Sequence, residues 1–356
     1  MRIKAVRKII SDGKCTHVLV NNIVDVEYIS GFRSSNATLL ISADKLTLYT
    51  DFRYRNAAEE FCRANTKWNF HLIEESNFKY LAKSTAPSSI VGIQSDTVTI
   101  DQLHELKRSL PKTKFAPLSN EIANISIQKN DKEIASMKAA AATGDKALKA
   151  LLPNIRTGMT EIELARQLEA LCAEYGSQRP SFETIALFGE RSALPHGRPG
   201  SRKLAPGDFI LLDYGCTVDG FCSDISRTFV FGEASQEQRK IYNIVLKAQT
   251  CARSAARSKI KACELDFAAR NVIEQSGYGE NFGHATGHGV GLRVHEKPRV
   301  NKKNEALLPE NCVITIEPGI YISGLGGVRI EDMVVLTGEG CSTLTNSPRK
   351  LIELPI

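Results

Sequence analysis

The sequence lacks long hydrophobic runs and blocks of like charge. No stretch approaches the ~20 apolar residues of a membrane-spanning helix, so we expect neither a membrane anchor nor a membrane partner. The formal net charge of +6 is spread over 356 residues, which does not indicate a nucleic-acid-binding surface. Residues 1–10 mix basic and scattered apolar side chains, a pattern that predicts a short amphipathic helix rather than a signal peptide.

The cysteines also lack any regular arrangement. There are 9 of them, an odd number, without CxxC pairs or the spacing of a zinc ribbon. This pattern indicates reduced, packed thiols and predicts a cytoplasmic protein. The amino-terminal part has no Gly-rich phosphate loop, and the chain shows no internal repeat or low-complexity segment.

The order of predicted elements divides the chain into two domains. Residues 1–125 alternate short strands (17–20, 38–42, 46–50, 91–94) with helices (52–63, 100–110), as in a small α/β domain. Residues 126–356 predict a larger α+β domain with paired helices around an antiparallel sheet. Its predicted helices span 131–152, 161–175, 236–256 and 265–275, and its strands span 184–188, 209–213, 226–231, 312–317 and 328–336.

A predicted hairpin brings two acids together. The apolar run Phe209–Leu212 ends at Asp213, and Asp219–Gly220 is typical of a two-residue turn with positive φ. Pairing around this turn sets Asp213 opposite Ser226 and on the same face as Asp224, with the two Asp Cα atoms roughly 7–8 Å apart. Such carboxylates repel one another unless a cation lies between them. A solvated hairpin with two surface acids is the alternative.

Three further motifs offer ligand side chains. Glu317 ends an apolar run ahead of a Pro-Gly turn. Arg329 and Glu331 lie two residues apart on a predicted strand and therefore share a face, although an ordinary Arg–Glu ion pair is the alternative. His288 lies between glycines, which allow close approach of the backbone to a site, although a flexible turn would look the same.

The candidate ligands comprise four carboxylates and one imidazole: Asp213, Asp224, His288, Glu317 and Glu331. An oxygen-rich set suits Mn²⁺, Fe²⁺, Co²⁺ or Zn²⁺ in a two-metal site better than a thiolate zinc site. Carboxylates can bridge, so these side chains could serve two ions ~3.5–4 Å apart. The spacing alone does not prove such a centre.

Motifs along residues 131–356 follow one another in a distinctive order: Pro195-His-Gly, Leu212-Asp-Tyr-Gly, Cys222-Ser-Asp, Gly287-His-Gly-Val-Gly, Val294-His-Glu, Thr315-Ile-Glu-Pro-Gly and Gly327-Val-Arg-Ile-Glu-Asp. In order and spacing they resemble the metallopeptidases with the pita-bread fold, which include aminopeptidase P, prolidase, methionine aminopeptidase and the metal-free creatinase. The segments Tyr28-Ile-Ser-Gly-Phe, Ser35-Asn-Ala-Thr and Tyr49-Thr-Asp-Phe-Arg-Tyr resemble the creatinase-type amino-terminal domain.

The resemblance implies an assignment for each ligand. Asp224, His288, Glu317 and Glu331 would hold one divalent ion, and Asp213 with bridging Asp224 and Glu331 would hold a second. Manganese is the first expectation, with Co²⁺ or Zn²⁺ as alternatives. Departures from the family pattern, such as Ser226 where Thr is usual, remove no ligand.

The resemblance also implies a mechanism, in which a metal-bound hydroxide attacks the scissile carbonyl. Glu317 would be the general base or proton shuttle, and His295 would stabilise the oxyanion. His196 and His284 would line the substrate site. Arg329 would orient Glu331 or bind the product carboxylate.

The creatinase-type domain, which methionine aminopeptidases lack, directs the prediction to peptidases acting on Xaa-Pro bonds. Such a bond has no N–H for an ordinary peptidase to grip, which favours a dedicated enzyme. We predict an aminopeptidase P that cleaves peptides with proline at the second position and forms a homodimer. The alternative is a prolidase restricted to Xaa-Pro dipeptides, and a non-catalytic scaffold would be expected to lose ligands.

Overall fold

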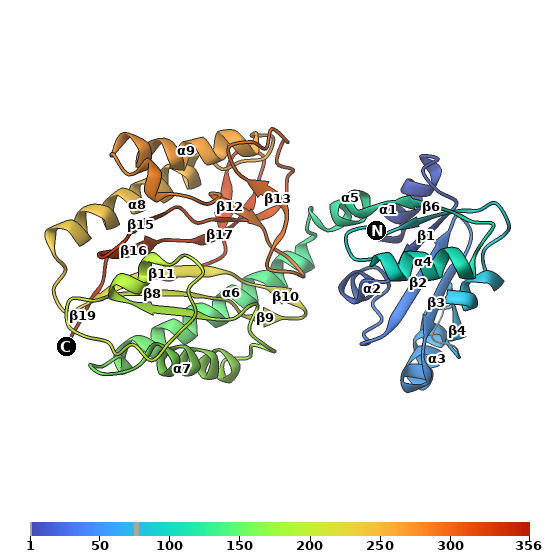
Figure 1. The fold of residues 1–356 in the computed structure, drawn as a ribbon, viewed down its shortest axis with the longest axis horizontal. Helices are drawn as coiled ribbons and strands as arrows, with labels where there is room; N and C mark the ends of the chain where they lie inside the picture. The colour runs from blue at the N-terminus through green and yellow to red at the C-terminus, as the bar shows by residue number, and fades with distance from the viewer. Residues whose placement is uncertain (1, 75–77) are drawn as a thin grey trace. The chain divides into compact units, whose positions relative to one another are not determined.

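The computed structural model describes residues 2–74 and 78–356. Its internal contacts separate the chain into two units, Met1–Ser126 and Ile127–Ile356, which Figure 1 draws in blue to blue-green and in green to red, respectively. Within the described ranges, every helix is too short or too polar to cross a lipid bilayer.

The first unit is built on a mixed sheet covered by helices. In spatial order its strands are β4 (Trp68–Leu72), β3 (Leu46–Thr50), β2 (Ala37–Ser42), β1 (His17–Val20), β5 (Ile90–Ile93) and β6 (Lys114–Pro117). Its helices are α1 (Arg2–Ser11), α2 (Ile23–Ser30), α3 (Arg55–Ala64), α4 (Ile100–Ser109) and α5 (Ser119–Ala123), with short 3₁₀ turns η1 (Phe52–Tyr54), η2 (Phe78–Lys83) and η3 (Asn124–Ser126). The apolar strands bury their side chains, including Leu19, Leu40 and Val91.

The elements of this unit follow the predicted pattern closely. The strands predicted at 17–20 and 46–50 are confirmed, and those predicted at 38–42 and 91–94 are shifted by one residue. The helix predicted over 52–63 is wrong at its start. Asp51 caps only the turn η1, because its side chain accepts a hydrogen bond from the Arg53 amide, and α3 then begins at Arg55.

The second unit has two main sheets and a short ribbon. One sheet runs β19 (Glu353–Leu354), β11 (Ile225–Phe231), β8 (Phe209–Tyr214) and β7 (Ile185–Phe188). The other runs β13 (Glu296–Val300), β12 (Gly287–Gly289), β14 (Val313–Ile316), β17 (Asp332–Leu336) and β18 (Cys341–Thr343). Strands β15 (Gly319–Ile322) and β16 (Gly326–Arg329) form the ribbon, and β9 (Thr217–Val218) and β10 (Phe221–Cys222) form the hairpin tip.

Helices cover these strands on two sides. They are α6 (Asp131–Leu151), α7 (Glu161–Glu174), α8 (Gln236–Ala255) and α9 (Ala262–Gln275), with 3₁₀ turns η4 (Leu152–Asn154), η5 (Gly189–Ala193) and η6 (Gly279–Asn281). Helices α6 and α7 pack in one apolar cluster with β7, β8 and β11, whereas α8 and α9 pack in another with β14 to β17. Figure 1 shows the two helix pairs on opposite sides of the strands. This arrangement confirms the predicted α+β architecture.

Capping side chains define where the helices of this unit begin. Thr160 Oγ1 accepts a hydrogen bond from the Glu163 amide, and the Glu163 carboxylate accepts one from the Thr160 amide, so the two residues form a capping box at the start of α7. Asn130 and Glu133 make the same pair at α6. Helix α6 ends at Leu151, just before the turn that contains Pro153.

The hairpin register is as predicted. Asp219 and Gly220 both have positive φ, 51° and 80°, and Asp213 pairs directly with Ser226. Side chains on β8 alternate: Ile210 and Leu212 enter the cluster with α6 and α7, so Asp213 projects to the opposite face. The acid at the end of a buried strand therefore points toward the side of the sheet where the other candidate ligands lie.

The strand predicted over 328–336 is wrong. The chain pairs with β15 up to Arg329, leaves the ladder at Ile330 and Glu331, and resumes as β17 against β14 from Asp332. The amide of Glu331 donates to the carbonyl of Ser226 instead of to a ladder partner. Arg329 and Glu331 therefore do not share a regular strand face, and the change of sheet between them directs both side chains to Ser226.

Candidate metal centre

Three potential ligands come from separate elements of the second unit. Asp224 immediately precedes β11, His288 is the middle residue of β12, and Glu331 lies in the break between β16 and β17. One ligand atom from each lies within 4.8 Å of the others. The side chains of Asp224 and Glu331 are almost fully buried, with exposed fractions of 6% and 1%. The fold thus gathers residues up to 107 positions apart in the chain.

His288 presents an unprotonated nitrogen to two carboxylates. Its Nδ1 lies 3.0 Å from the Gly289 carbonyl, which can only accept, so Nδ1 carries the proton. Its Nε2 lies 3.4 Å from Glu317 Oε1 and 3.6 Å from Asp224 Oδ2. A lone pair facing two carboxylates is unfavourable unless a cation lies among them, and a fixed Nδ1–H is the usual second contact of a ligating histidine.

The glycines around His288 are required by close strand packing. A Cβ atom on Gly287 would lie 2.0 Å from the Thr315 carbonyl oxygen, and one on Gly289 would lie 2.2 Å from the Lys297 carbonyl oxygen. Residue types with a side chain could not occupy either position without moving backbone. The glycines therefore allow β12 to approach its neighbouring strands closely, and their predicted role in approach to the site itself stays a prediction.

Asp213 and Glu331 each leave one carboxylate oxygen unused. Arg329 Nη2 donates to Asp213 Oδ2 at 2.6 Å, and Ser226 Oγ donates to Glu331 Oε2 at 2.7 Å. The other oxygens, Asp213 Oδ1 and Glu331 Oε1, are buried and have no hydrogen-bond partner among residues 2–74 and 78–356. An unpaired buried carboxylate oxygen is costly, so these atoms are free to bind a cation.

Burial and mutual repulsion raise the pKa values of three of the candidate ligands, Asp224, Glu317 and Glu331. Burial, followed by the charges of Glu331 and Asp213, raises the pKa of Asp224 well above its ordinary value. Burial, followed by the charges of Glu317 and Asp213, does the same to the pKa of Glu331. Burial raises the pKa of Glu317 to about 7. A divalent cation would reverse this penalty, so the four carboxylates and His288 fit a metal centre.

The structure connects Asp213 to His284 through the predicted residue Arg329 and through Tyr321, which the sequence did not single out. Arg329, which is bonded to Asp213, also donates from Nη1 to Tyr321 Oη at 2.8 Å. His284 Nδ1 donates to the Ala285 carbonyl, so Nε2 accepts from Tyr321 Oη at 2.9 Å. Burial lowers the pKa of His284 to about 4, which keeps the imidazole neutral in this chain of contacts.

The remaining predicted residues lie at the edge of the cluster. The ring centroid of His295 is 4.4 Å from that of His288, and burial followed by the charge of His288 lowers its pKa. His196 lies in an exposed loop after η5, close enough to Glu317, His284 and His295 to contribute to the shifts in their pKa values. All the sequence-predicted residues therefore belong to one region of the second unit.

Arg299 is a further cation at this edge. It pairs with His288 across β12 and β13, and its charge lowers the pKa values of His288 and His295. Its side chain is exposed and has no hydrogen bond or ion pair within the part of the chain that the structure describes. No strand was predicted over 296–300, so the sequence did not indicate that Arg299 would lie opposite His288.

Comparison with known proteins agrees with this geometry. The family model described as metallopeptidase family M24 matches residues 135–338, and the creatinase/prolidase N-terminal domain matches residues 2–125. An Xaa-Pro dipeptidase from Pyrococcus horikoshii is 37% identical over 353 residues, which cover 99% of this chain and 98% of the relative.

Solved structures give the same result. An Xaa-Pro dipeptidase from Bacillus anthracis superposes with a TM-score of 0.94 at 35% identity, and an X-Pro aminopeptidase from Thermotoga maritima with 0.89 at 34%. Each comparison covers 99% of both chains. The resemblance to pita-bread metallopeptidases is therefore confirmed. The chain belongs to metallopeptidase family M24 and carries the creatinase/prolidase amino-terminal domain in front of its pita-bread catalytic domain.

Proposed function

We propose that this M24 metallopeptidase is an Xaa-Pro dipeptidase. The observation that carries the proposal is the buried cluster of four carboxylates and His288, in which two carboxylate oxygens have no partner among the described residues. Full-length relatives named Xaa-Pro dipeptidase, from Pyrococcus horikoshii and Pyrococcus furiosus, support the dipeptidase alternative better than the aminopeptidase P reading of the sequence.

Five residues would hold two divalent ions: Asp213, Asp224, His288, Glu317 and Glu331. Manganese is the first expectation, and Co²⁺ or Zn²⁺ would also suit these oxygen and nitrogen donors. When bound, such ions supply an activated water and polarise the scissile carbonyl. The protein supplies the rest, which is proton transfer, orientation of the peptide and exclusion of wrong substrates.

Glu317 is the proposed general base and proton shuttle. General acid–base catalysis requires a carboxyl group placed beside the reacting centre, and Glu317 Oε1 lies 3.4 Å from His288 Nε2 within the cluster of candidate ligands. Thr315 Oγ1 donates to Glu317 Oε1 at 3.2 Å and fixes one side of the carboxylate. The other oxygen is then oriented for the proton that must reach the proline nitrogen before it can leave.

The histidines have distinct proposed roles in binding the peptide. His295 lies beside His288, and partial burial of its ring followed by the charge of His288 lowers its pKa, which favours the neutral imidazole; its N–H can donate a hydrogen bond to the developing oxyanion. Both ring nitrogens of His284 are engaged by the protein, so this residue would contact the proline through its ring. His196 would complete the substrate pocket from its loop.

Arg299 gives a physical reason for preferring a dipeptide. A dipeptide carries its free carboxylate on the proline itself, within one residue of the scissile bond. An exposed guanidinium next to His288 and His295 could receive that carboxylate, since arginine pairs well with carboxylates. Arg329 is less available, because its Nη2 is already bonded to Asp213.

The test is a substrate comparison on metal-stripped protein reloaded with Mn²⁺. The substrates are an Xaa-Pro dipeptide, an Xaa-Pro-Yaa-Yaa tetrapeptide and an Xaa-Ala dipeptide as a control. We expect cleavage of the Xaa-Pro dipeptide alone. Preferred cleavage of the tetrapeptide would restore the aminopeptidase P assignment. Bound metal without cleavage of either peptide would overturn the Xaa-Pro assignment and leave only the metal centre, whereas absence of metal binding would point to a non-catalytic scaffold.

A further inference from the structure

Behind the candidate metal ligands lies a fully buried ion pair. The side chains of Arg227, on β11, and Asp332, at the start of β17, both have 0% exposure, and Arg227 Nη2 donates to Asp332 Oδ1 at 2.8 Å. Arg227 follows Ser226 and therefore projects to the face of β11 away from the metal ligands. A buried ion pair rarely adds stability unless its remaining donors and acceptors are satisfied.

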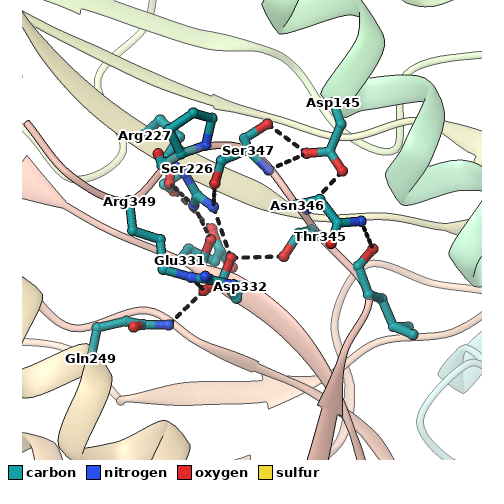
Figure 2. Close-up of polar contacts among 12 residues, drawn as sticks. Asp145, Ser226, Arg227, Gln249, Glu331, Asp332, Thr345, Asn346, Ser347 and Arg349 are labelled. Atoms are coloured by element: carbon teal, nitrogen blue, oxygen red, sulfur yellow. Dashed lines mark hydrogen bonds and ion pairs between the residues drawn. The ribbon is translucent and has the colours of Figure 1, made fainter. Parts of the chain in front are cut away.

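Arg227 uses each of its five N–H donors (Figure 2). Besides Asp332, it donates to four backbone carbonyls. Those of Ser226 and Glu331 accept from Nη1, that of Ser347 accepts from Nη2 at 2.8 Å, and that of Pro348 accepts from Nε at 2.9 Å. One guanidinium therefore joins three separate segments of the chain, and two of them lie beside metal ligands.

Asp332 is equally saturated. Its Oδ1 accepts from Arg227 and from Thr345 Oγ1 at 2.8 Å, and its Oδ2 accepts from Gln249 Nε2 at 2.6 Å and from Arg349 Nε. The adjacent Glu331 differs, because its Oε1 is buried without a partner in the described ranges. Of two neighbouring acids, one is satisfied by the protein and the other is left for a cation.

The carboxyl-terminal segment 345–349 supplies half of these contacts, and α6 fixes that segment in turn. Asp145 on α6 accepts hydrogen bonds from the amides of Asn346 and Ser347, at 2.7 and 2.8 Å (Figure 2). The network thus extends from the metal ligands through Arg227 and Asp332 to a helix on the outer layer.

We propose that Arg227 and Asp332 are positioning residues for the metal centre. Together with segment 345–349 they fix the backbone of Ser226 and Glu331, and so keep Asp224 and Glu331 close together before metal binds. Without such an anchor the repelling carboxylates would move apart, and metal binding would have to draw them together again. The inference rests on the metal centre of the proposed function but not on its peptide substrate.

The test measures Mn²⁺ binding to metal-stripped protein by calorimetry, and the electron paramagnetic resonance of the loaded protein. Asp332→Asn removes the charge at nearly constant shape, and Thr345→Val removes one hydroxyl donor from the carboxyl-terminal segment. Asp208→Asn and Thr143→Val are matched controls: Asp208 pairs with Arg202, and Thr143 donates to Ala139 within α6. Neither control residue contacts the network or a ligand in any hydrogen bond of the described chain.

We expect Asp332→Asn to weaken Mn²⁺ binding about 10–100-fold, the usual effect of losing a residue that orients a metal ligand. Thr345→Val should weaken binding several-fold and alter the resonance of the bound metal. The controls should bind Mn²⁺ like the wild type even where they lower the melting temperature. If Asp332→Asn does not fold, the test is the Mn²⁺ affinity of Thr345→Val compared with that of its control, Thr143→Val.

Wild-type Mn²⁺ affinity and resonance in a folded Asp332→Asn or Thr345→Val variant would overturn the proposal. So would a loss of affinity that is equal in the control variants, because it would reflect general destabilisation. Absence of Xaa-Pro hydrolysis in a wild-type protein that binds Mn²⁺ would instead contradict the proposed dipeptidase function and leave this inference intact.

Discussion

Arg299 provides the sharpest test of why this protein should act on dipeptides. The change is Arg299→Met, which removes the guanidinium and keeps a long side chain. A hydrogen bond to a charged group contributes about 1.5–3 kcal/mol, and an exposed arginine falls at the lower end because water screens it. At about 1.4 kcal/mol per tenfold, kcat/KM for an Xaa-Pro dipeptide should fall roughly tenfold, mainly through KM.

The assay compares the dipeptide with the corresponding Xaa-Pro amide, in which a neutral group replaces the carboxylate. We expect Arg299→Met to leave kcat/KM for the amide nearly unchanged, so that the preference for the dipeptide disappears. Lys302→Met is the control, because it removes another exposed cation two residues beyond β13; it should change kcat/KM for neither the dipeptide nor the amide. Equal losses on both substrates would refute carboxylate recognition by Arg299.

Three further predictions concern stability and the pH dependence of the metal-free protein. Ser226→Ala leaves Glu331 Oε2 without its donor and Arg329 Nε without its acceptor. The free energy of unfolding, measured by denaturant titration, should therefore fall by about 2–3 kcal/mol. Ser226→Thr keeps the hydroxyl group, so this variant should lose less stability. Thr160→Ala removes the N-cap of α7 and should lower the free energy of unfolding by about 1 kcal/mol without changing the affinity for Mn²⁺. A loss of Mn²⁺ affinity in this variant would contradict a purely structural role for Thr160. Since the pKa of Glu317 rises from 4.5 to about 7 on folding, its contribution to stability is present below pH 4.5 and is lost as pH rises through about 7. The melting temperature of the metal-stripped protein should therefore fall more steeply between pH 5 and 8 than that of metal-stripped Glu317→Gln. Parallel plots of melting temperature against pH for the two proteins would contradict the raised pKa.

The hairpin was predictable from sequence because local rules determine it. Asp219–Gly220 fixes the turn, and a side-chain period of two then sets Asp213 opposite Ser226. His288 and Glu317 were predictable for a similar reason, since glycines and a Pro-Gly turn mark close approach and strand ends. The resemblance to the family then assigned their roles as ligands.

Other parts of the centre depend on long-range packing that no local pattern encodes. Glu331 reaches the cluster because the chain changes sheets between Arg329 and Asp332, where the sequence predicted one continuous strand. Arg299 faces His288 only because β12 and β13 pair with one another, and neither strand was predicted from the sequence. The acceptors of Arg227 are mostly backbone carbonyls from distant segments, and carbonyl groups carry no sequence signal.

The most direct measurement follows hydrolysis of an Xaa-Pro dipeptide while Mn²⁺ is added back to metal-stripped protein, with bound metal counted per chain. The metal centre proposed here predicts no hydrolysis by the stripped protein and a rise in activity as metal binds. Because the five candidate ligands can bridge, they should hold up to two ions per chain. Glu331→Gln should bind less metal and remain inactive. Full hydrolysis in the presence of a chelator, or complete metal loading without hydrolysis, would contradict the assignment of a metal-dependent Xaa-Pro dipeptidase.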